Sequence, residues 1–126
     1  MPTVFVYGTL LKNESNSHLL AGSVLLDANC YIYGELYDTS LGYPTVCVEM
    51  ETDQVVWGEL YEVRDEVLHK IDALEGYIGD ELANDYDRLV INVYRRQAVT
   101  KALVYVYPSI KTAHMSLITS GRWRNR

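Results

Sequence analysis

The sequence predicts a small α+β fold, a mostly antiparallel closed β-barrel with one main helix. Two observations carry this prediction. About seven short runs of β-branched and aromatic residues alternate with turn residues, and one central stretch has helical periodicity. So many strands within 126 residues must curl or close to hide their edges, which favours a barrel over an open sheet.

The first part of the chain predicts one strand followed by a long loop. The length is that of one domain, so we expect residues 1–126 to fold together. Thr3–Tyr7 is β-branched and ends at Gly8, which predicts the first strand. The polar stretch Leu10–Gly22 is irregular, with one helical turn expected at Ser17–Leu20.

The remaining strands are separated by residues that favour turns. We expect strands at Ser23–Leu26, Cys30–Tyr37, Thr45–Met50, Val55–Val63, Leu89–Tyr94 and Ala102–Tyr107. Gly42 and Pro44 mark a turn, and Thr52–Gln54 is expected to form a hairpin turn. The tetrapeptide Gly-Glu-Leu-Tyr occurs at 34–37 and again at 58–61, so these two strands are predicted to play equivalent roles. Glycine within a strand predicts a bulge or a bend.

The segment Asp65–Leu74 is predicted to be the main helix, with Asp65 as its N-cap. Its apolar stripe consists of Val67, Leu68, Ile71 and Leu74. With ~100° per residue, Glu75 falls between Ile71 and Leu68 on the helical wheel, inside the apolar arc. Gly76 is expected to end the helix in a left-handed conformation.

Glu75 is therefore a candidate catalytic residue. A carboxylate directed toward the interior from a helix C-terminus has a raised pKa, because burial and the helix dipole both disfavour the anion. A carboxyl group that titrates near neutral pH suits general acid–base chemistry. The alternative is that a glutamate in the last turn bends back into solvent.

The segment Tyr7-Gly8-Thr9-Leu10 is a candidate anion-binding loop. A glycine at a strand end lets backbone N–H groups converge on a concavity that binds carboxylate or phosphate oxygens. The segment has neither a phosphate-binding P-loop pattern nor a dinucleotide fingerprint. The alternative is an ordinary turn between a strand and a loop.

Composition argues against several functions. The 11 basic and 17 acidic residues give a net charge of −6, which does not suit a general nucleic-acid binder. Trp123 is expected to pack, with its neighbouring arginines solvated. We predict no membrane span, because no apolar run approaches about 18 residues. The N-terminus lacks the pattern of a signal peptide, so we expect a cytoplasmic protein.

Cysteine and histidine patterns predict neither a metal site nor a nucleophile. Cys30 and Cys47 lie in apolar runs, and buried free thiols are favoured over a disulfide. His18, His69 and His114 are scattered, so no ligand cluster emerges. Tyrosine is unusually frequent, with 11 residues, which fits either a polar cavity or a tyrosine-rich sheet surface.

Several motifs in chain order resemble the γ-glutamylcyclotransferase-like (AIG2-like) family. They are Val6–Leu10, the turn at Tyr43-Pro44, Gly58–Tyr61 followed by the Ile-Asp-x-x-Glu-Gly pattern at 71–76, Tyr86–Arg88, Ala102–Tyr105, and Ser120–Trp123. Asn13 stands where many members have glycine, and Asn tolerates left-handed backbone. The segment Ile78–Asp85 is longer than in compact relatives, and the sequence does not decide whether it covers the pocket.

The resemblance implies a reaction and a site. It implies that Glu75 is the acid/base, that the loop of Tyr7, Gly8, Thr9 and Leu10 holds the substrate's α-carboxylate, and that Tyr43 and Tyr86 line the pocket. The implied substrate is a small γ-glutamyl compound, cyclised to 5-oxoproline without metal or cofactor. The alternative is a non-catalytic binding or interaction domain on the same fold. The presence of Glu75 together with the loop favours the enzyme.

Overall fold

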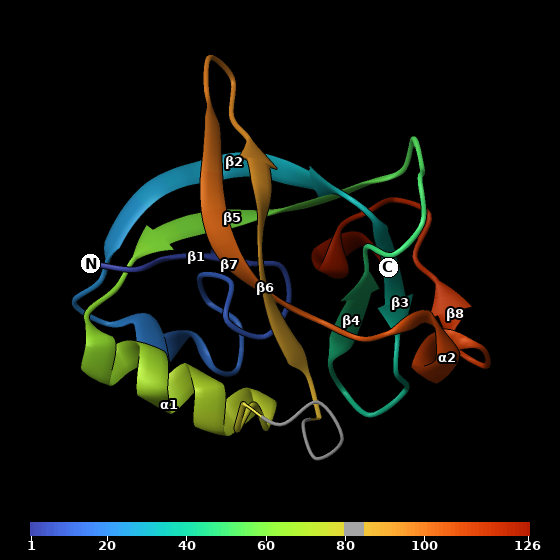
Figure 1. Cartoon of the computed structure of the whole chain (residues 1–126), viewed down its shortest axis with the longest axis horizontal. Helices are drawn as coiled ribbons and strands as arrows, with labels where there is room; N and C mark the ends of the chain where they lie inside the picture. The colour runs from blue at the N-terminus through green and yellow to red at the C-terminus, as the bar shows by residue number, and fades with distance from the viewer. Residues whose placement is uncertain (80–84) are drawn as a thin grey trace.

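The chain folds around a closed five-stranded barrel in the order β1-β5-β2-β6-β7 (Figure 1). The structure is a computed structural model that describes residues 1–79 and 85–126. The barrel strands are β1 (Thr3–Val6), β2 (Val24–Tyr33), β5 (Val55–Glu62), β6 (Asp87–Tyr94) and β7 (Val99–Val106). Antiparallel pairing joins β1 to β5, β5 to β2, β2 to β6 and β6 to β7, while β1 and β7 close the barrel in parallel. The predicted barrel is confirmed.

A second, three-stranded sheet lies beside the barrel in the order β4-β3-β8. Its elements are β3 (Glu35–Asp38), β4 (Pro44–Cys47) and β8 (Ser116–Leu117), with the short helix α2 (Ser109–Thr112) next to them. The Tyr107 N–H donates to the Val46 carbonyl at 2.9 Å and so joins the end of β7 to β4. The start of this sheet's strand β4, at Pro44, forms part of the wall of a cavity.

The strand boundaries differ from the prediction at Gly34. The predicted strand Ser23–Leu26 and the first four residues of the predicted strand Cys30–Tyr37 form one barrel strand, β2, with irregular pairing around Asp27. The chain then breaks at Gly34 and passes into β3 of the other sheet. The two Gly-Glu-Leu-Tyr segments therefore lie in different sheets, and the prediction of equivalent roles is wrong. The segment β4 ends at Cys47 rather than Met50, and α2 was not predicted.

Gly58 lies where β5 presses against β1. A Cβ atom at this position would lie 2.1 Å from the Val6 carbonyl oxygen and 2.6 Å from Cζ of Phe5. The absence of a side chain lets the two strands and the interior ring of Phe5 approach closely, as glycine in a strand permits.

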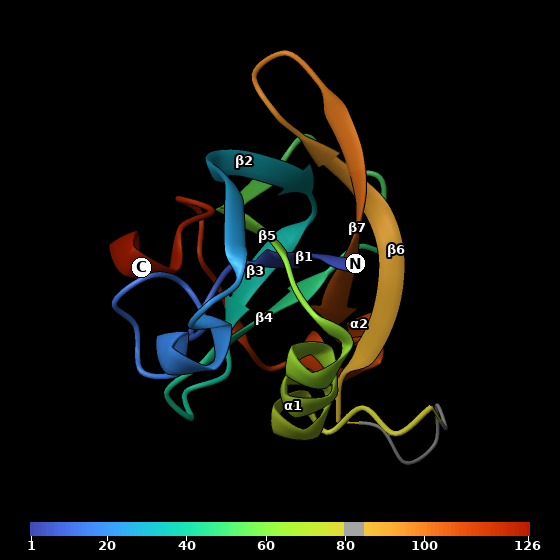
Figure 2. The ribbon, with the colours of Figure 1, turned by 90° about the vertical axis from the view of Figure 1, so that its left-hand side faces the viewer.

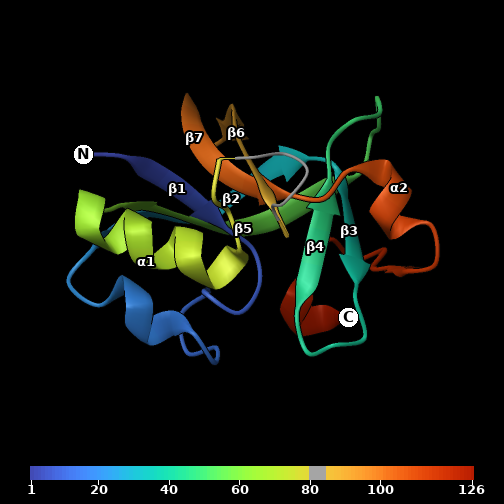
Figure 3. The same cartoon turned by 60° about the horizontal axis from the view of Figure 1, so that its bottom comes forward.

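The helix α1 (Asp65–Glu75) lies across one end of the barrel, and the β6–β7 hairpin extends from the opposite end (Figures 1 and 2). The short 3-10 turn η1 (Ser17–Leu20) packs beside α1, as Figure 3 shows. The left-handed cap at Gly76 is confirmed, with φ of 67°. Two details differ. Arg64 occupies the N-cap position, so Asp65 is the first helical residue, and Leu74 is 42% exposed rather than part of the core.

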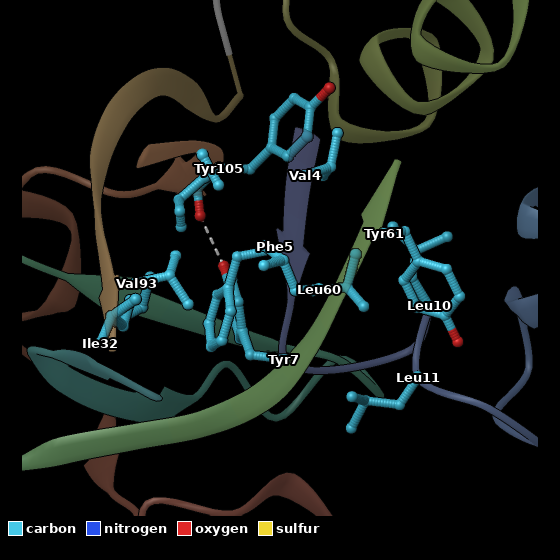
Figure 4. Packing of buried hydrophobic residues seen from close by; sticks show 14 of the residues in the cluster. Val4, Phe5, Tyr7, Leu10, Leu11, Ile32, Leu60, Tyr61, Val93 and Tyr105 are labelled. Carbon is cyan, nitrogen blue, oxygen red and sulfur yellow. Dashed lines mark hydrogen bonds between the residues drawn. The ribbon is translucent and has the colours of Figure 1, made fainter. Parts of the chain in front are cut away.

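Apolar side chains fill the barrel. The core contains side chains that are almost fully buried and belong to one cluster, among them Phe5, Ile32, Leu60 and Val93 (Figure 4). Cys30 and Cys47 are buried free thiols, as expected. Trp123, in the 3-10 turn η2 (Trp123–Asn125), is buried while Arg122 and Arg124 are exposed. In the part of the chain that the structure describes, no helix is long and apolar enough to cross a membrane.

Candidate active site

A cavity of about 480 Å³ opens where β1 ends, between the barrel, the C-terminal end of α1 and the start of β4. Its volume lies in the range of small-molecule sites. The residues lining it include all seven predicted site residues: Tyr7, Gly8, Thr9, Leu10, Tyr43, Glu75 and Tyr86. Residues far apart in the sequence are brought together because β1, α1 and β6 all end or begin at this end of the barrel.

The side chains of the Tyr7–Leu10 loop are occupied by contacts within the protein. The Tyr7 hydroxyl donates to the Tyr105 carbonyl at 2.7 Å, and Leu10 is buried. The Thr9 hydroxyl and carbonyl accept hydrogen bonds from the Asn16 side chain at 3.0 Å and from its N–H at 2.8 Å. Among the described residues, the N–H groups of Gly8, Thr9 and Leu10 have no hydrogen-bond acceptor. The loop therefore offers backbone donors.

Gly8 is held tightly against β4. A Cβ atom at Gly8 would lie 2.5 Å from Cγ of Pro44 and 2.7 Å from its Cδ. Prediction from the sequence explained this glycine by the path of the backbone alone. The structure adds a steric reason, because Pro44 occupies the space that a side chain would need.

The loop is anchored on its far side by a buried carboxylate. Glu59 of β5 is 6% exposed, and its Oε1 accepts the Lys12 N–H at 2.9 Å and the Tyr61 hydroxyl at 3.0 Å. Its Oε2 lies 3.7 Å from the Arg124 guanidinium. Asn13, next in the loop, has φ of 69°, so it adopts the left-handed backbone expected for it. Glu59 thus ties the loop to the barrel and to the C-terminal segment.

Glu75 is half-buried at the end of α1 and lines the cavity. Burial raises the pKa of its carboxyl group from the ordinary value of 4.5 to about 7. No hydrogen bond to this carboxylate is found within residues 1–79 and 85–126. The group can therefore hold or release a proton near neutral pH while facing open space.

Tyrosines surround this carboxyl group. The charge of Glu75 raises the phenol pKa values of Tyr7, Tyr86, Tyr105 and Tyr107, although burial is the larger cause in each. The Tyr86 hydroxyl donates to the Pro44 carbonyl at 2.5 Å, and its ring packs on Tyr107 with centroids 4.3 Å apart. All four phenols stay protonated at neutral pH, so they add no charge beside Glu75. The polar-cavity interpretation of the tyrosine content is thus favoured here.

Sequence reasoning missed several residues of the cavity wall. Ser15, Asn16, Asp85, Tyr105 and Tyr107 also line it. Asn16 lies in the irregular loop, where no pattern marks it. Tyr105 lies in β7 and Tyr107 directly follows it, and neither was marked as a site residue by the strand pattern or by the motif Ala102–Tyr105.

Part of the predicted segment Ile78–Asp85, residues 80–84, lies outside the described residues. Within the described ranges, no three His, Cys, Asp or Glu side chains cluster in a way that could hold a metal ion. The histidines His18, His69 and His114 are exposed.

The family model described as "Gamma-glutamyl cyclotransferase, AIG2-like" matches residues 4–125. The chain belongs to this family. It is a cyclotransferase-type enzyme, and the resemblance stated from the sequence motifs is confirmed.

Individual relatives agree with this family. The γ-L-glutamyl-butirosin B γ-glutamyl cyclotransferase of Niallia circulans is 40% identical over 108 residues, covering 85% of this chain and 67% of the relative. A protein of Halalkalibacterium halodurans, provisionally named a γ-glutamylcyclotransferase, is 34% identical, covering 82% and 90%. The crystal structure of YkqA from Bacillus subtilis matches with a TM-score of 0.78 and 31% identity. That match covers 98% of this cyclotransferase and 39% of YkqA.

Proposed function

We propose that the chain cyclises a γ-glutamyl compound to 5-oxoproline and releases the amine or amino acid that the glutamyl group carried. The observation that carries this proposal is a carboxyl group with a pKa of about 7 that shares one cavity with three backbone N–H groups, which have no acceptor among the described residues. The N–H groups of Gly8, Thr9 and Leu10 bind the α-carboxylate of the glutamyl group, and Tyr43 and Tyr86 line its path.

The proposed chemistry moves two protons from the attacking nitrogen to the leaving nitrogen and exchanges one C–N bond. Glu75 takes the first proton from the α-ammonium, and the freed amine attacks the γ-carbonyl carbon. The bond from that carbon to the leaving nitrogen then breaks as Glu75 gives this proton to the leaving nitrogen. The attacking nitrogen loses its second proton as it becomes the ring amide, and that proton converts the released amine to its ammonium form. Nucleophile and electrophile belong to one substrate, so the enzyme mainly selects the folded-back conformer and transfers the proton.

Release of 5-oxoproline tests this function. Purified enzyme is incubated with γ-glutamyl-α-amino acids, γ-glutamylalkylamines and γ-L-glutamyl-butirosin B, and 5-oxoproline is measured by mass spectrometry. The last compound belongs in the panel because the Niallia circulans relative is named for it. We expect turnover of at least one class. Absence of 5-oxoproline from the whole panel, with a known cyclotransferase active in parallel, would refute the proposed reaction.

The pH profile of the reaction should show the raised pKa of Glu75. We expect kcat/KM to fall on the acid side with an apparent pKa of about 7, because the free enzyme needs the ionised base. In kcat the acid limb should move to lower pH, since the bound α-ammonium favours the carboxylate. Initial rates of 5-oxoproline formation, measured between about pH 4 and pH 10, give the acid limb of kcat/KM and the acid limb of kcat. A flat acid side down to the pH of unfolding would contradict the role of Glu75.

A further inference from the structure

A second carboxylate lies one helical turn before Glu75 and binds the barrel. Asp72 of α1 accepts the Tyr105 hydroxyl at its Oδ1, at 2.5 Å. The Arg88 guanidinium donates from Nη1 to both Asp72 oxygens, at 3.0 and 2.8 Å. The side chains of Asp72 and Arg88 are 15% and 24% exposed, so the pair is shielded from solvent. The helix is therefore fixed to β6 and β7 through charge-assisted hydrogen bonds.

Tyr105 connects this pair to the anion-binding loop. Its hydroxyl donates to Asp72 on the helix, while its backbone carbonyl accepts the hydroxyl of Tyr7 at 2.7 Å, the dashed line in Figure 4. Tyr105 is 3% exposed and lines the cavity. One residue thus contacts both the Tyr7–Leu10 loop and the helix that carries Glu75.

The backbone of the last helical turn is held as well, but the carboxylate of Glu75 is not. The Tyr86 N–H donates to the Glu75 carbonyl at 3.1 Å, and the Tyr77 N–H donates to the Asp72 carbonyl at 2.9 Å. The Arg88 guanidinium also lies 4.6 Å from the centre of the Tyr77 ring. Since Glu75 has no side-chain hydrogen bond among the described residues, its place in the cavity depends on where the helix is held.

We propose that Asp72 is a positioning residue that, through Tyr105 and Arg88, sets the place of the Glu75 carboxylate relative to the Tyr7–Leu10 loop. In sequence terms, the Asp of the Ile-Asp-x-x-Glu-Gly pattern and the Arg of Tyr86–Arg88 meet in this ion pair. The assignment of turnover to Glu75 rests on the proposed function, whereas the positioning itself does not.

The groups that face Glu75 determine how its pKa would respond if the C-terminal end of α1 were less firmly held. From the other elements these are the phenols of Tyr7, Tyr86, Tyr105 and Tyr107, together with Asp85 in the cavity wall. Among the cations of neighbouring elements, Arg88 is paired with Asp72, and Lys111 lies over the Tyr107 ring. Burial is the cause of the raised Glu75 pKa. A helix end that is less firmly held would expose the carboxylate and lower its pKa toward 4.5.

The variant Tyr105→Phe tests the proposal because it removes the hydroxyl and leaves the ring and the carbonyl that accepts Tyr7. The pKa of Glu75 is measured by NMR titration of its ¹³C-labelled carboxyl carbon, which needs no substrate. We expect that pKa to fall by about one unit. With a substrate that the wild type turns over, kcat should fall about tenfold or more while KM changes less than about twofold, since misplacement of a base affects the chemical step.

Tyr37→Phe is the matched control. The Tyr37 hydroxyl donates to the Glu35 carboxylate at 3.0 Å in β3, so the control loses the same kind of bond at a residue that does not line the cavity. We expect it to leave the Glu75 pKa and kcat unchanged. A Glu75 pKa in Tyr105→Phe within about 0.2 units of the wild type would overturn the positioning role.

The ion pair provides a second, independent test. Asp72→Asn removes the charge that faces Arg88. Asp27→Asn is its control, because it removes the charge that faces Arg95 in a similarly shielded ion pair on the barrel. In that pair Arg95 Nε lies 3.1 Å from Asp27 Oδ2. Comparable losses of melting temperature are expected, but only Asp72→Asn should lower the Glu75 pKa. Equal effects of the two variants on that pKa would overturn the proposal. If the wild type released no 5-oxoproline, the proposed function would fail while the titrations still decided the positioning.

Discussion

Replacing Glu75 by Gln is expected to lower kcat by at least about 10²–10⁴, the usual contribution of a general base. The amide has nearly the same shape and makes no hydrogen bond that the fold requires, because the Glu75 carboxylate has no partner among the described residues. Fold and ligand binding should survive. The measurement is the rate of 5-oxoproline release together with the affinity for a non-cyclising γ-glutamyl analogue.

The same variant should be more stable than the wild type above neutral pH. Between pH 4.5 and about 7 the folded protein binds the Glu75 proton more tightly than the unfolded chain, so wild-type stability falls as the pH rises through this range. Gln carries no such proton. We therefore expect equal stability below about pH 4.5 and a gain of about 1–3 kcal/mol above pH 7 for Glu75→Gln.

Two results would contradict the assignment of Glu75. The first is a variant that keeps more than about a tenth of the activity, since a general base contributes more than that. The second is a difference in free energy of unfolding that does not change with pH, which would mean that the carboxyl group is not desolvated in the native state. Glu66→Gln is the matched control, because Glu66 is exposed on the first turn of the same helix.

Replacing Glu59 by Ala is expected to destabilise the fold and weaken substrate binding together. The change leaves the Lys12 N–H and the Tyr61 hydroxyl without their acceptor and removes the anion beside Arg124. A buried donor left without its acceptor, here the Tyr61 hydroxyl, costs about 1–3 kcal/mol. The Tyr7–Leu10 loop loses its anchor on the barrel side, so KM should rise by about tenfold while kcat changes little.

Denaturant unfolding and steady-state kinetics check the Glu59 prediction. Glu62→Ala is the control, because Glu62 also belongs to β5 but is only half-buried and does not line the cavity. A Glu59→Ala enzyme with unchanged KM would show that the loop keeps its shape without this anchor.

The barrel and the site were predictable for different reasons. The alternating pattern of the strands and the helical period of one segment predicted these elements, because side-chain periodicity follows directly from backbone geometry. The helical wheel predicted that Glu75 faces the interior, with a solvent-facing glutamate as the alternative, and the structure has it half-buried in the cavity wall. The path of the chain at Gly34 was not predictable, since a break that moves a strand into another sheet depends on contacts with distant residues. Leu74 likewise follows the apolar period but lies at the cavity wall with 42% of its surface exposed.

Local pattern could not reveal the contacts that brace the site. The network of Asp72, Arg88 and Tyr105 joins α1, β6 and β7, and Glu59 joins β5 to a loop 47 positions away. From the sequence alone, each of these side chains could equally be an ordinary surface or core residue. Only the register of the barrel strands brings them within hydrogen-bond distance.

The parallel pairing of β1 with β7 has a consequence for how the protein folds. Val4 is paired with Leu103, so the contact that closes the barrel joins nearly the two ends of the chain. Closing so long a loop costs entropy before any contact compensates for it, which predicts slow folding, on the order of milliseconds to seconds. During synthesis, the edge of β1 that pairs with β7 stays unpaired until β7 has left the ribosome. Because Tyr7 follows β1 and Tyr105 lies in β7, the candidate active site is expected to be assembled in the last step of folding, and a nascent chain that lacks β7 should be inactive.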